Sequence, residues 1–105
     1  MQKILVFWRD IPSQVIIKKG RERGKALLAP MFQEAIDRAA MRAGKGGSDA
    51  YMSEWVRHTS SLEAEGDLNE LARAEADRIE AEYSKERIKE MVSFFGYAEK
   101  PEKRG

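Results

Sequence analysis

Residues 3–19 read KILVFWRDIPSQVIIKK and hold the densest apolar, β-branched and aromatic content of the chain. Two short apolar runs, residues 4–8 and 14–18, flank the segment 9–13. Runs of this composition are typical of β-strands, and Asp10 and Pro12 are residue types that favour turns. The stretch therefore predicts a β-hairpin whose two strands are joined by a five-residue connection, residues 9–13.

Both predicted hairpin strands are apolar on two sides. Side chains alternate across a strand, so Ile4, Val6 and Trp8 point one way while Leu5 and Phe7 point the other. A strand covered on one side only would alternate more cleanly between apolar and polar residues. We therefore expect a helix or a partner to cover each face of this hairpin.

The segment after the hairpin is basic and glycine-rich. Residues 18–25 combine lysines and arginines with two glycines, which predicts an exposed loop. Solvation of a strand exit explains this composition, and binding of phosphate or acidic groups is the sharper alternative. The glycine spacing fits no known phosphate-loop pattern.

A helix is predicted to begin near Pro30 and to end at Gly44. Proline suits the first turn of a helix, glycine suits its end, and apolar residues recur at helical spacing from Phe32 to Ala43. Residues 50–62 alternate in the manner of a strand and predict a third strand. A short helix after Ser48 is the alternative there.

The last third of the chain is rich in Ala and Glu and predicts helix. Asp67 is the expected N-cap, and apolar stripes continue from there to Gly96. The pattern leaves open whether residues 67–95 form one helix or two. Residues 97–105 have the composition of a flexible polar tail.

Together these elements predict an α+β fold in a single domain over residues 1–96. The expected order is ββαβαα, with the hairpin and the third strand forming a three-stranded antiparallel sheet packed by two to three helices. Three strands are the minimum for a sheet that is stable by itself. A chain of 105 residues is the size of one domain.

Composition narrows the classes of function. The formal net charge of +1 argues against nucleic-acid binding by the whole chain, and no apolar window is long enough for a membrane span. The N-terminus does not have the form of a signal peptide, so we expect a cytoplasmic protein. The chain has no cysteine and a single histidine, His58, without ligand-spaced neighbours, so we expect no metal site.

Candidates for contact with a ligand or partner lie near the ends of the predicted strands. Arg9 and Asp10 at the hairpin tip could bind an anion or a partner loop, or they could pair locally. The aromatic residues could form a binding face on the sheet or part of the core. The full set is Trp8, Arg9, Asp10, Lys18, Lys19, Arg21, Asp49, Tyr51 and Trp55.

Three blocks of the sequence resemble a small bacterial virulence-factor domain family. They are WRDIPSQVI (residues 8–16), EAIDRAAMRAG (34–44) and DAYMSEW (49–55). The family label names a phenotype rather than a reaction, so the resemblance implies no active site. Small members are often encoded beside enzymes of folate-linked one-carbon metabolism, which implies an accessory subunit of such an enzyme.

These observations predict a non-catalytic protein-interaction module. It would be an accessory subunit of a bacterial metabolic enzyme or a homo-oligomer. One alternative is a small-molecule or cofactor-binding protein, or a small enzyme, with an anionic ligand at the end of the sheet. Another is a weak nucleic-acid-binding protein that uses the basic segment 18–25. The sequence indicates no particular cofactor.

Overall fold

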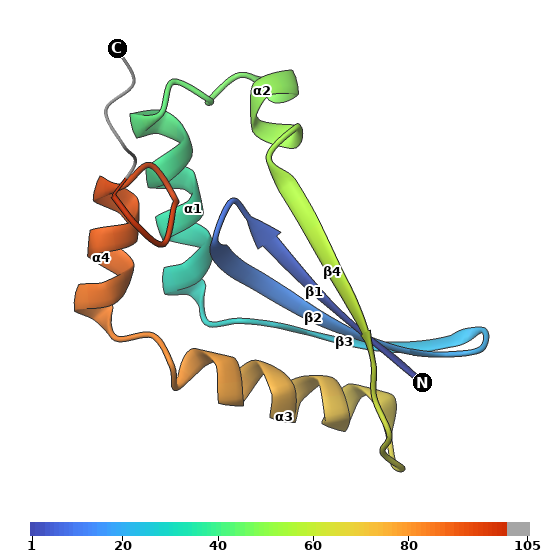
Figure 1. The fold of residues 1–105 in the computed structure, drawn as a ribbon. Helices are drawn as coiled ribbons and strands as arrows, with labels where there is room; N and C mark the ends of the chain where they lie inside the picture. The colour runs from blue at the N-terminus through green and yellow to red at the C-terminus, as the bar shows by residue number, and fades with distance from the viewer. Residues whose placement is uncertain (101–105) are drawn as a thin grey trace.

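The hairpin forms the centre of a four-stranded antiparallel sheet in the computed structural model, which describes residues 1–100 (Figure 1). The strands lie in the order β3-β2-β1-β4. They are β1 (Gln2–Trp8), β2 (Ile11–Lys19), β3 (Glu22–Leu27) and β4 (Trp55–Ser61). The helices are α1 (Pro30–Arg42), α2 (Ser48–Met52), α3 (Leu68–Glu80) and α4 (Lys85–Ser93).

The connection in the first hairpin is shorter than predicted. Only Arg9 and Asp10 join β1 to β2, and Arg9 has a left-handed φ of 54°. Pro12 lies inside β2, where the pairing register shifts between Val6 and Phe7 of β1. A β-bulge of this kind accommodates proline, which has no N–H to donate to the ladder. The predicted five-residue connection is wrong because Pro12 belongs to a bulge and not to the turn.

The predicted loop over residues 18–25 is also wrong. Strand β2 continues to Lys19, and Gly20 and Arg21 turn the chain directly into β3. Gly20 has a φ of 61°, a conformation that tight two-residue hairpin turns require. Strand β3 carries several charged side chains, so its sequence lacks the apolar alternation by which a strand is predicted. Charged residues are nevertheless common on edge strands. The sheet therefore has four strands and not three.

The predicted strand over residues 50–62 divides into two elements. The alternative short helix forms first, as α2, and only the later part of the segment forms a strand, β4. The predicted order ββαβαα is therefore replaced by βββααβαα. The α+β class and the antiparallel sheet are confirmed.

The predicted helix after Pro30 is confirmed as α1, and Gly44 follows its end with a φ of 72°. The region after residue 67 forms two helices. The carboxylate of Asp67 caps α3 by accepting the backbone N–H groups of Asn69 and Glu70. The hydroxyl of Ser84 caps α4 in the same way. A new cap at Ser84 explains why the helix does not continue through this point.

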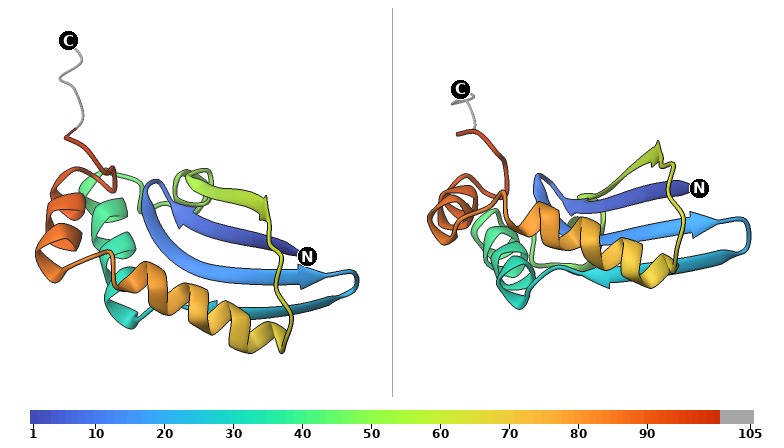
Figure 2. Two further views of the ribbon diagram at one scale, coloured as in Figure 1. Left: turned by 60° about the horizontal axis from the view of Figure 1, so that its bottom comes forward. Right: turned by 90° about the horizontal axis from the view of Figure 1, so that it is seen from below.

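Helix α3 lies across one face of the sheet, against β2 and β3 (Figure 2). Gly24 makes this close approach possible, because a Cβ atom there would lie 2.3 Å from the backbone carbonyl carbon of Leu68. Helices α1 and α4 pack together at one end of the sheet. The core side chains that are most completely buried include Trp8, Ile11, Val15, Ile17, Phe32 and Ile36.

The end of the predicted polar tail lies outside the described residues. Within the described part, the Tyr97 ring lies against the guanidinium of Arg9, 4.5 Å from its central carbon to the ring centroid. The backbone of Ala98 accepts a hydrogen bond from Arg87 and donates one to Asp10. The start of the segment 97–105 therefore contacts the first hairpin.

One ion pair links the sheet to α3 and predicts a dependence of stability on pH. Hydrogen bonds from Arg78 and from Lys3 lower the pKa of Glu75 below its ordinary value. A lowered folded-state pKa stabilises the protein above the unfolded pKa of about 4.3, and this stability is lost as pH falls through the folded pKa. We expect Glu75→Gln to lower the free energy of unfolding by about 0.5–1 kcal/mol at neutral pH.

Urea unfolding at a series of pH values from neutral downward measures this effect. The difference between Glu75→Gln and the wild type should be constant near neutral pH and should shrink as the pH falls below the unfolded pKa of about 4.3. Glu65→Gln is the matched control, because Glu65 is an exposed acid outside the helices that pairs with no cation among residues 1–100. A difference at neutral pH that persists unchanged in acid would contradict this account.

Candidate functional site

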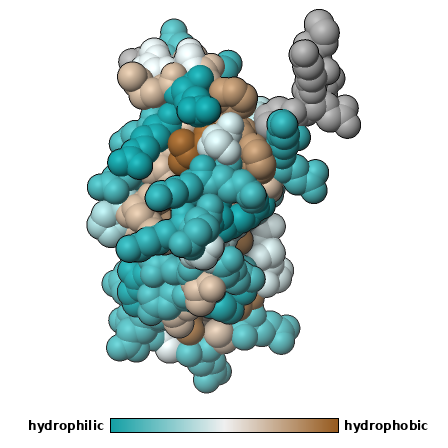
Figure 3. Space-filling view, turned by 90° about the vertical axis from the view of Figure 1, so that its left-hand side faces the viewer, coloured by the Kyte–Doolittle hydropathy of each residue, from teal (hydrophilic) through white to brown (hydrophobic). Residues whose placement is uncertain are grey.

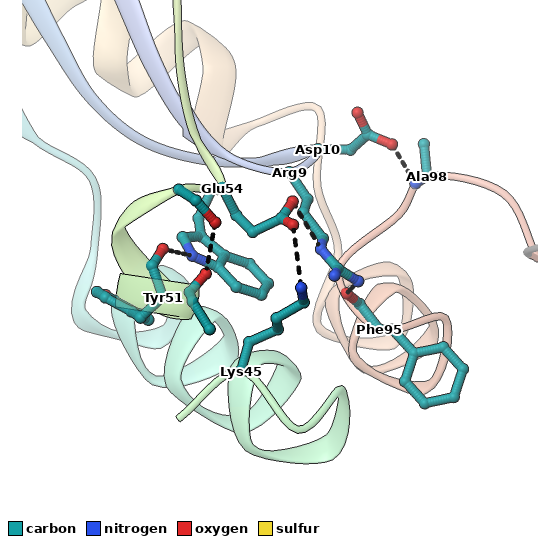
Figure 4. Close-up of polar contacts among 10 residues, drawn as sticks. Arg9, Asp10, Lys45, Tyr51, Glu54, Phe95 and Ala98 are labelled. Carbon is teal, nitrogen blue, oxygen red and sulfur yellow. Dashed lines mark hydrogen bonds and ion pairs between the residues drawn. The ribbon is translucent and has the colours of Figure 1, made fainter. Parts of the chain in front are cut away.

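Arg9 is the centre of a contact network at the β1–β2 turn (Figure 4). Its Nε atom lies 3.1 Å from Glu54 Oε2, and its Nη1 donates to the carbonyl of Phe95 over 2.8 Å. Its central carbon lies 5.2 Å from the Trp8 ring centroid, and its side chain is only 8% exposed. Lys45 lies 3.8 Å from the other oxygen of Glu54. The guanidinium is therefore held by groups of the chain itself and is not presented to a ligand.

Aromatic side chains extend this network into the core. The indole N–H of Trp8 donates to the carbonyl of Tyr51 over 2.9 Å, and the two rings are stacked. The Tyr51 ring in turn meets Trp55 edge-on. Trp8 is fully buried. These rings hold α2 against the hairpin, so they take the core role of the two roles considered from the sequence.

Asp10 closes the network toward the C-terminal segment. Its backbone N–H donates to the carbonyl of Gly96 over 2.9 Å, and its carboxylate accepts the N–H of Ala98 over 2.7 Å. Gly96 has a φ of 95°, and a Cβ atom there would lie 2.9 Å from the Trp8 ring. The turn between β1 and β2 is thus joined by hydrogen bonds to the chain that follows α4.

The candidate residues named from the sequence fall into two groups. Trp8, Arg9, Asp10, Tyr51 and Trp55 meet around the first turn, whereas Lys18, Lys19 and Arg21 lie at the β2–β3 turn, at the opposite end of the sheet (Figure 1). Asp49 lies in the first turn of α2 and is exposed. The structure therefore does not assemble them into one pocket.

One face of the sheet is covered by a helix only at its end near the β1–β2 turn, where Tyr51 of α2 contacts Trp8 and Trp55. The register places Ile4, Val6 and Ile16 on the face opposite α3, outside the main hydrophobic core cluster. We call this surface the open face. Both faces of the hairpin had been expected to be covered by a helix or a partner. Helix α3 covers the opposite face, whereas only the short α2 packs at one end of the open face (Figure 2). Val6 and Ile16 are nevertheless only 6% and 9% exposed, as expected where the stems of long polar side chains lie over apolar neighbours.

The open face is basic. The register places Lys18, Arg23, Lys25 and Arg57 on it, together with residues that are apolar or uncharged, and no acid. Lys18 and Arg23 are directly opposed on neighbouring strands, an arrangement that destabilises a sheet. None of the four cations forms an ion pair within residues 1–100. The register also places on this face Gln2, Gln14, Leu27, Thr59 and Ser61, and at its end near the β1–β2 turn Trp8 and Trp55.

Strand β4 forms an unprotected edge of the same sheet. It makes its main contacts with β1 alone, and every residue after Trp55 is exposed. The other edge strand, β3, is covered by α3. Exposed edges usually carry several charges, a proline or a bulge that prevents pairing with another chain. Strand β4 reads WVRHTSS and has only one charged residue, Arg57, apart from the titratable His58.

The hydrogen bonds at the two ends of β4 show which backbone groups face outward. Leu62 N–H donates to Met1 O over 2.9 Å, and Arg9 N–H donates to Glu54 O over 3.1 Å. Opposed residues in an antiparallel pair exchange both bonds at every second position. The even-numbered residues of β4 therefore bond to β1. The odd-numbered ones, among them Arg57 and Thr59, direct N–H and C=O groups to the open edge.

Sequence reasoning missed Arg23, Lys25 and Arg57 as candidates. The first two were assigned to a loop, and Arg57 was one residue in an ambiguous alternating segment. Their shared location can be predicted once the four strands are known, because residues at alternate positions of a strand lie on the same face of the sheet. His58 lies on the other face of β4, where its ring meets Phe7 edge-on at 5.3 Å between centroids.

Residues 1–100 contain no cluster of three His, Asp or Glu side chains that could hold a metal ion. No helix in this part of the chain has the length and apolar character needed to cross a membrane.

An α+β protein with an open-edged sheet is the class that this geometry defines. A family model described as virulence factor matches residues 6–92. The chain therefore belongs to the virulence factor family, which confirms the resemblance of its three sequence blocks. No curated protein and no solved structure matches the chain.

Proposed function

We propose that this protein is a non-catalytic interaction module that binds a partner protein by adding a partner strand to the edge of β4. The observation that carries the proposal is the row of outward N–H and C=O groups at Arg57 and Thr59, on a strand whose other contacts are with β1 alone. An added strand would satisfy these groups with main-chain hydrogen bonds. Side chains on either face of the added strand would then give specificity.

Charge supports an acidic partner. Arg57 lies on the open face beside the edge, and Lys18, Arg23 and Lys25 continue the same basic surface across the sheet. A partner with carboxylates on this side would relieve the repulsion between the opposed Lys18 and Arg23. Complementary charge also raises the rate of association, and this contribution weakens with salt.

The same surface disfavours two other occupants. A second copy paired at β4 would place two basic faces side by side, which costs electrostatic energy. Single-stranded nucleic acid binds sheets through stacking of bases on aromatic rings as well as through charge. The two aromatic residues that the register places on this face, Trp8 and Trp55, lie at its end beside α2, where Trp8 is fully buried and both rings contact Tyr51. We therefore favour an acidic protein over a homo-oligomer or an RNA.

The family resemblance suggests where to seek the partner. Enzymes of folate-linked one-carbon metabolism are the first candidates, and the protein would serve them as an accessory subunit in the cytoplasm. A small module with an open sheet edge suits this role, since strand addition needs no pocket in the module itself.

Proline at residue 59 should abolish partner binding. Thr59→Pro removes an outward N–H and leaves the ladder with β1 intact, because proline is tolerated on an edge when its missing N–H faces solvent. The tagged protein is used to capture partners from its native lysate at low salt. We expect Thr59→Pro to capture about one tenth as much partner as the wild type, or less. The proline removes one main-chain hydrogen bond, and its ring blocks the approach of the added strand.

Two variants control this experiment. Thr59→Val keeps the backbone N–H and should bind as the wild type does. His58→Pro removes a bond to β1 and should lower the melting temperature, whereas Thr59→Pro should leave the fold largely intact. Amide hydrogen exchange of the free protein gives an independent check, with fast exchange at Arg57 and Thr59 and slow exchange at His58. Equal capture by Thr59→Pro and Thr59→Val would refute strand addition, and retention on heparin with no protein captured would favour nucleic acid.

A further inference from the structure

A groove between α1 and α4 lies on the side of the molecule away from the open edge of β4. It has a volume of about 230 Å³. Its floor is apolar and comes from residues one turn apart on each helix, Met31 and Ala35 on α1 and Ile88 and Val92 on α4. On this side of the molecule, hydrophobic surface appears between bands of hydrophilic side chains (Figure 3).

The rim of the groove is charged and predominantly basic. Arg38 comes from α1, Lys85 and Lys89 come from α4, and Glu34 is the single acid. All four side chains are exposed. Within the described part of the chain, none of the three cations lies within ion-pair distance of a carboxylate, and Glu34 forms no pair with Arg38. The rim therefore leaves a net positive charge over an apolar floor.

From this arrangement we infer that the groove binds a medium-chain aliphatic carboxylate. The apolar chain would lie along Ile88 and Val92, and the carboxylate would meet Lys85, Lys89 or Arg38 at the rim. At roughly 30 Å³ for each water-sized unit, the groove has room for about eight non-hydrogen atoms, which is enough for the alkyl chain of octanoate with its carboxylate outside at the rim. It is smaller than the pockets of roughly 300–1,000 Å³ that hold drug-sized ligands, so a short chain fits better than a large cofactor.

The balance of forces supports this ligand class. Each methylene removed from water contributes about 0.8 kcal/mol, so chain length sets the affinity. The basic rim favours a negatively charged head group, because a carboxylate is attracted by three cations and repelled by only one acid. Glu34 repels a carboxylate less strongly than the three cations attract it, and it would not by itself attract an ammonium group past three like charges. An anionic head on an aliphatic chain satisfies both parts of the groove.

Titration of the isotope-labelled protein with octanoate, followed by amide chemical shifts, tests the inference. Octanoate should shift the amides of α1 and α4 and leave β4 unchanged. Butyrate and octylammonium should each bind at least about tenfold more weakly, the first through lost methylene burial and the second through charge. Binding should also raise the melting temperature by mass action.

Charge reversal at the rim provides the matched variants. Lys89→Glu should weaken octanoate binding by about fivefold and strengthen octylammonium binding, as expected for one exposed charge near the head group. Lys100→Glu makes the same change at an exposed lysine outside the groove lining and should leave both affinities unchanged. Val92→Trp should fill the groove and abolish octanoate binding. If Val92→Trp does not fold, the result for Lys89→Glu tests the inference instead.

Three results would overturn the inference. They are equal affinity for octanoate and octylammonium, shifts spread over the sheet rather than confined to α1 and α4, and no shifts at millimolar octanoate. A peptide helix that binds the groove when octanoate does not would assign it to a protein partner instead. The test does not depend on β4, so Thr59→Pro should bind octanoate as the wild type does.

Discussion

Replacing Gly24 with alanine is expected to lower the free energy of unfolding by about 3 kcal/mol, which is at the upper end of the cost of overpacking. A Cβ atom at this position would lie 2.3 Å from the carbonyl carbon of Leu68 and 2.4 Å from the backbone nitrogen of Asn69. These are backbone atoms, so no side-chain rotation can relieve the clash. The first turn of α3 must move away from β3, and the hydrogen bond from Lys25 N–H to Asn69 Oδ1 would be lost with it.

Thermal or urea denaturation of the two proteins measures this effect. Gly47→Ala is the matched control, because Gly47 has a φ of −74° and no atom lies within 4 Å of a Cβ placed there. That variant should differ from the wild type by less than about 0.5 kcal/mol. If Gly24→Ala proved as stable as Gly47→Ala, the close contact between β3 and α3 would be wrong.

Truncation of Arg9 to alanine should cost about 3 kcal/mol, because it leaves Glu54 and the carbonyl of Phe95 without their main partner. It also removes the cation that lies over the rings of Trp8 and Tyr97. The backbone adds a second test at the same position. Since Arg9 has a φ of 54°, Arg9→Gly should be more stable than Arg9→Ala by about 1 kcal/mol.

Urea unfolding followed by tryptophan fluorescence suits this series, because buried Trp8 is part of the network. Arg21→Ala is the control, since Arg21 is exposed in the β2–β3 turn, and we expect a change below about 0.5 kcal/mol. Arg9→Ala and Arg9→Gly of equal stability would show that the positive φ carries no strain. A loss at Arg9 no larger than that at Arg21 would show that the network contributes little.

Local sequence patterns predicted the elements whose signals are strong and continuous. The helix after Pro30 and the N-cap at Asp67 followed directly from spacing and capping chemistry. The errors arose where two structures share one pattern. Pro12 is as compatible with a bulge as with a turn, and the charges of β3 are as compatible with an edge strand as with a loop.

The candidate site was predictable only in part, for a related reason. Aromatic residues and an Arg-Asp pair near the first turn were visible in the sequence, and the structure brings them together. Their role as an internal network depends on Gly96 and Phe95, which are distant in sequence. The open edge of β4 could not be seen at all, because strand order decides which strand has no neighbour and sequence does not specify that order locally.

The hydrogen bonds between Asp10 and the segment after α4 have a consequence for how the chain folds as it is made. The partners Asp10 and Ala98 are separated by 88 positions, and the carbonyl of Phe95 binds the neighbouring Arg9. The first hairpin leaves the ribosome long before these late residues exist. Its turn therefore lacks the contacts with the segment after α4 until that segment has emerged, so full stability should arise only once residue 98 has left the ribosome.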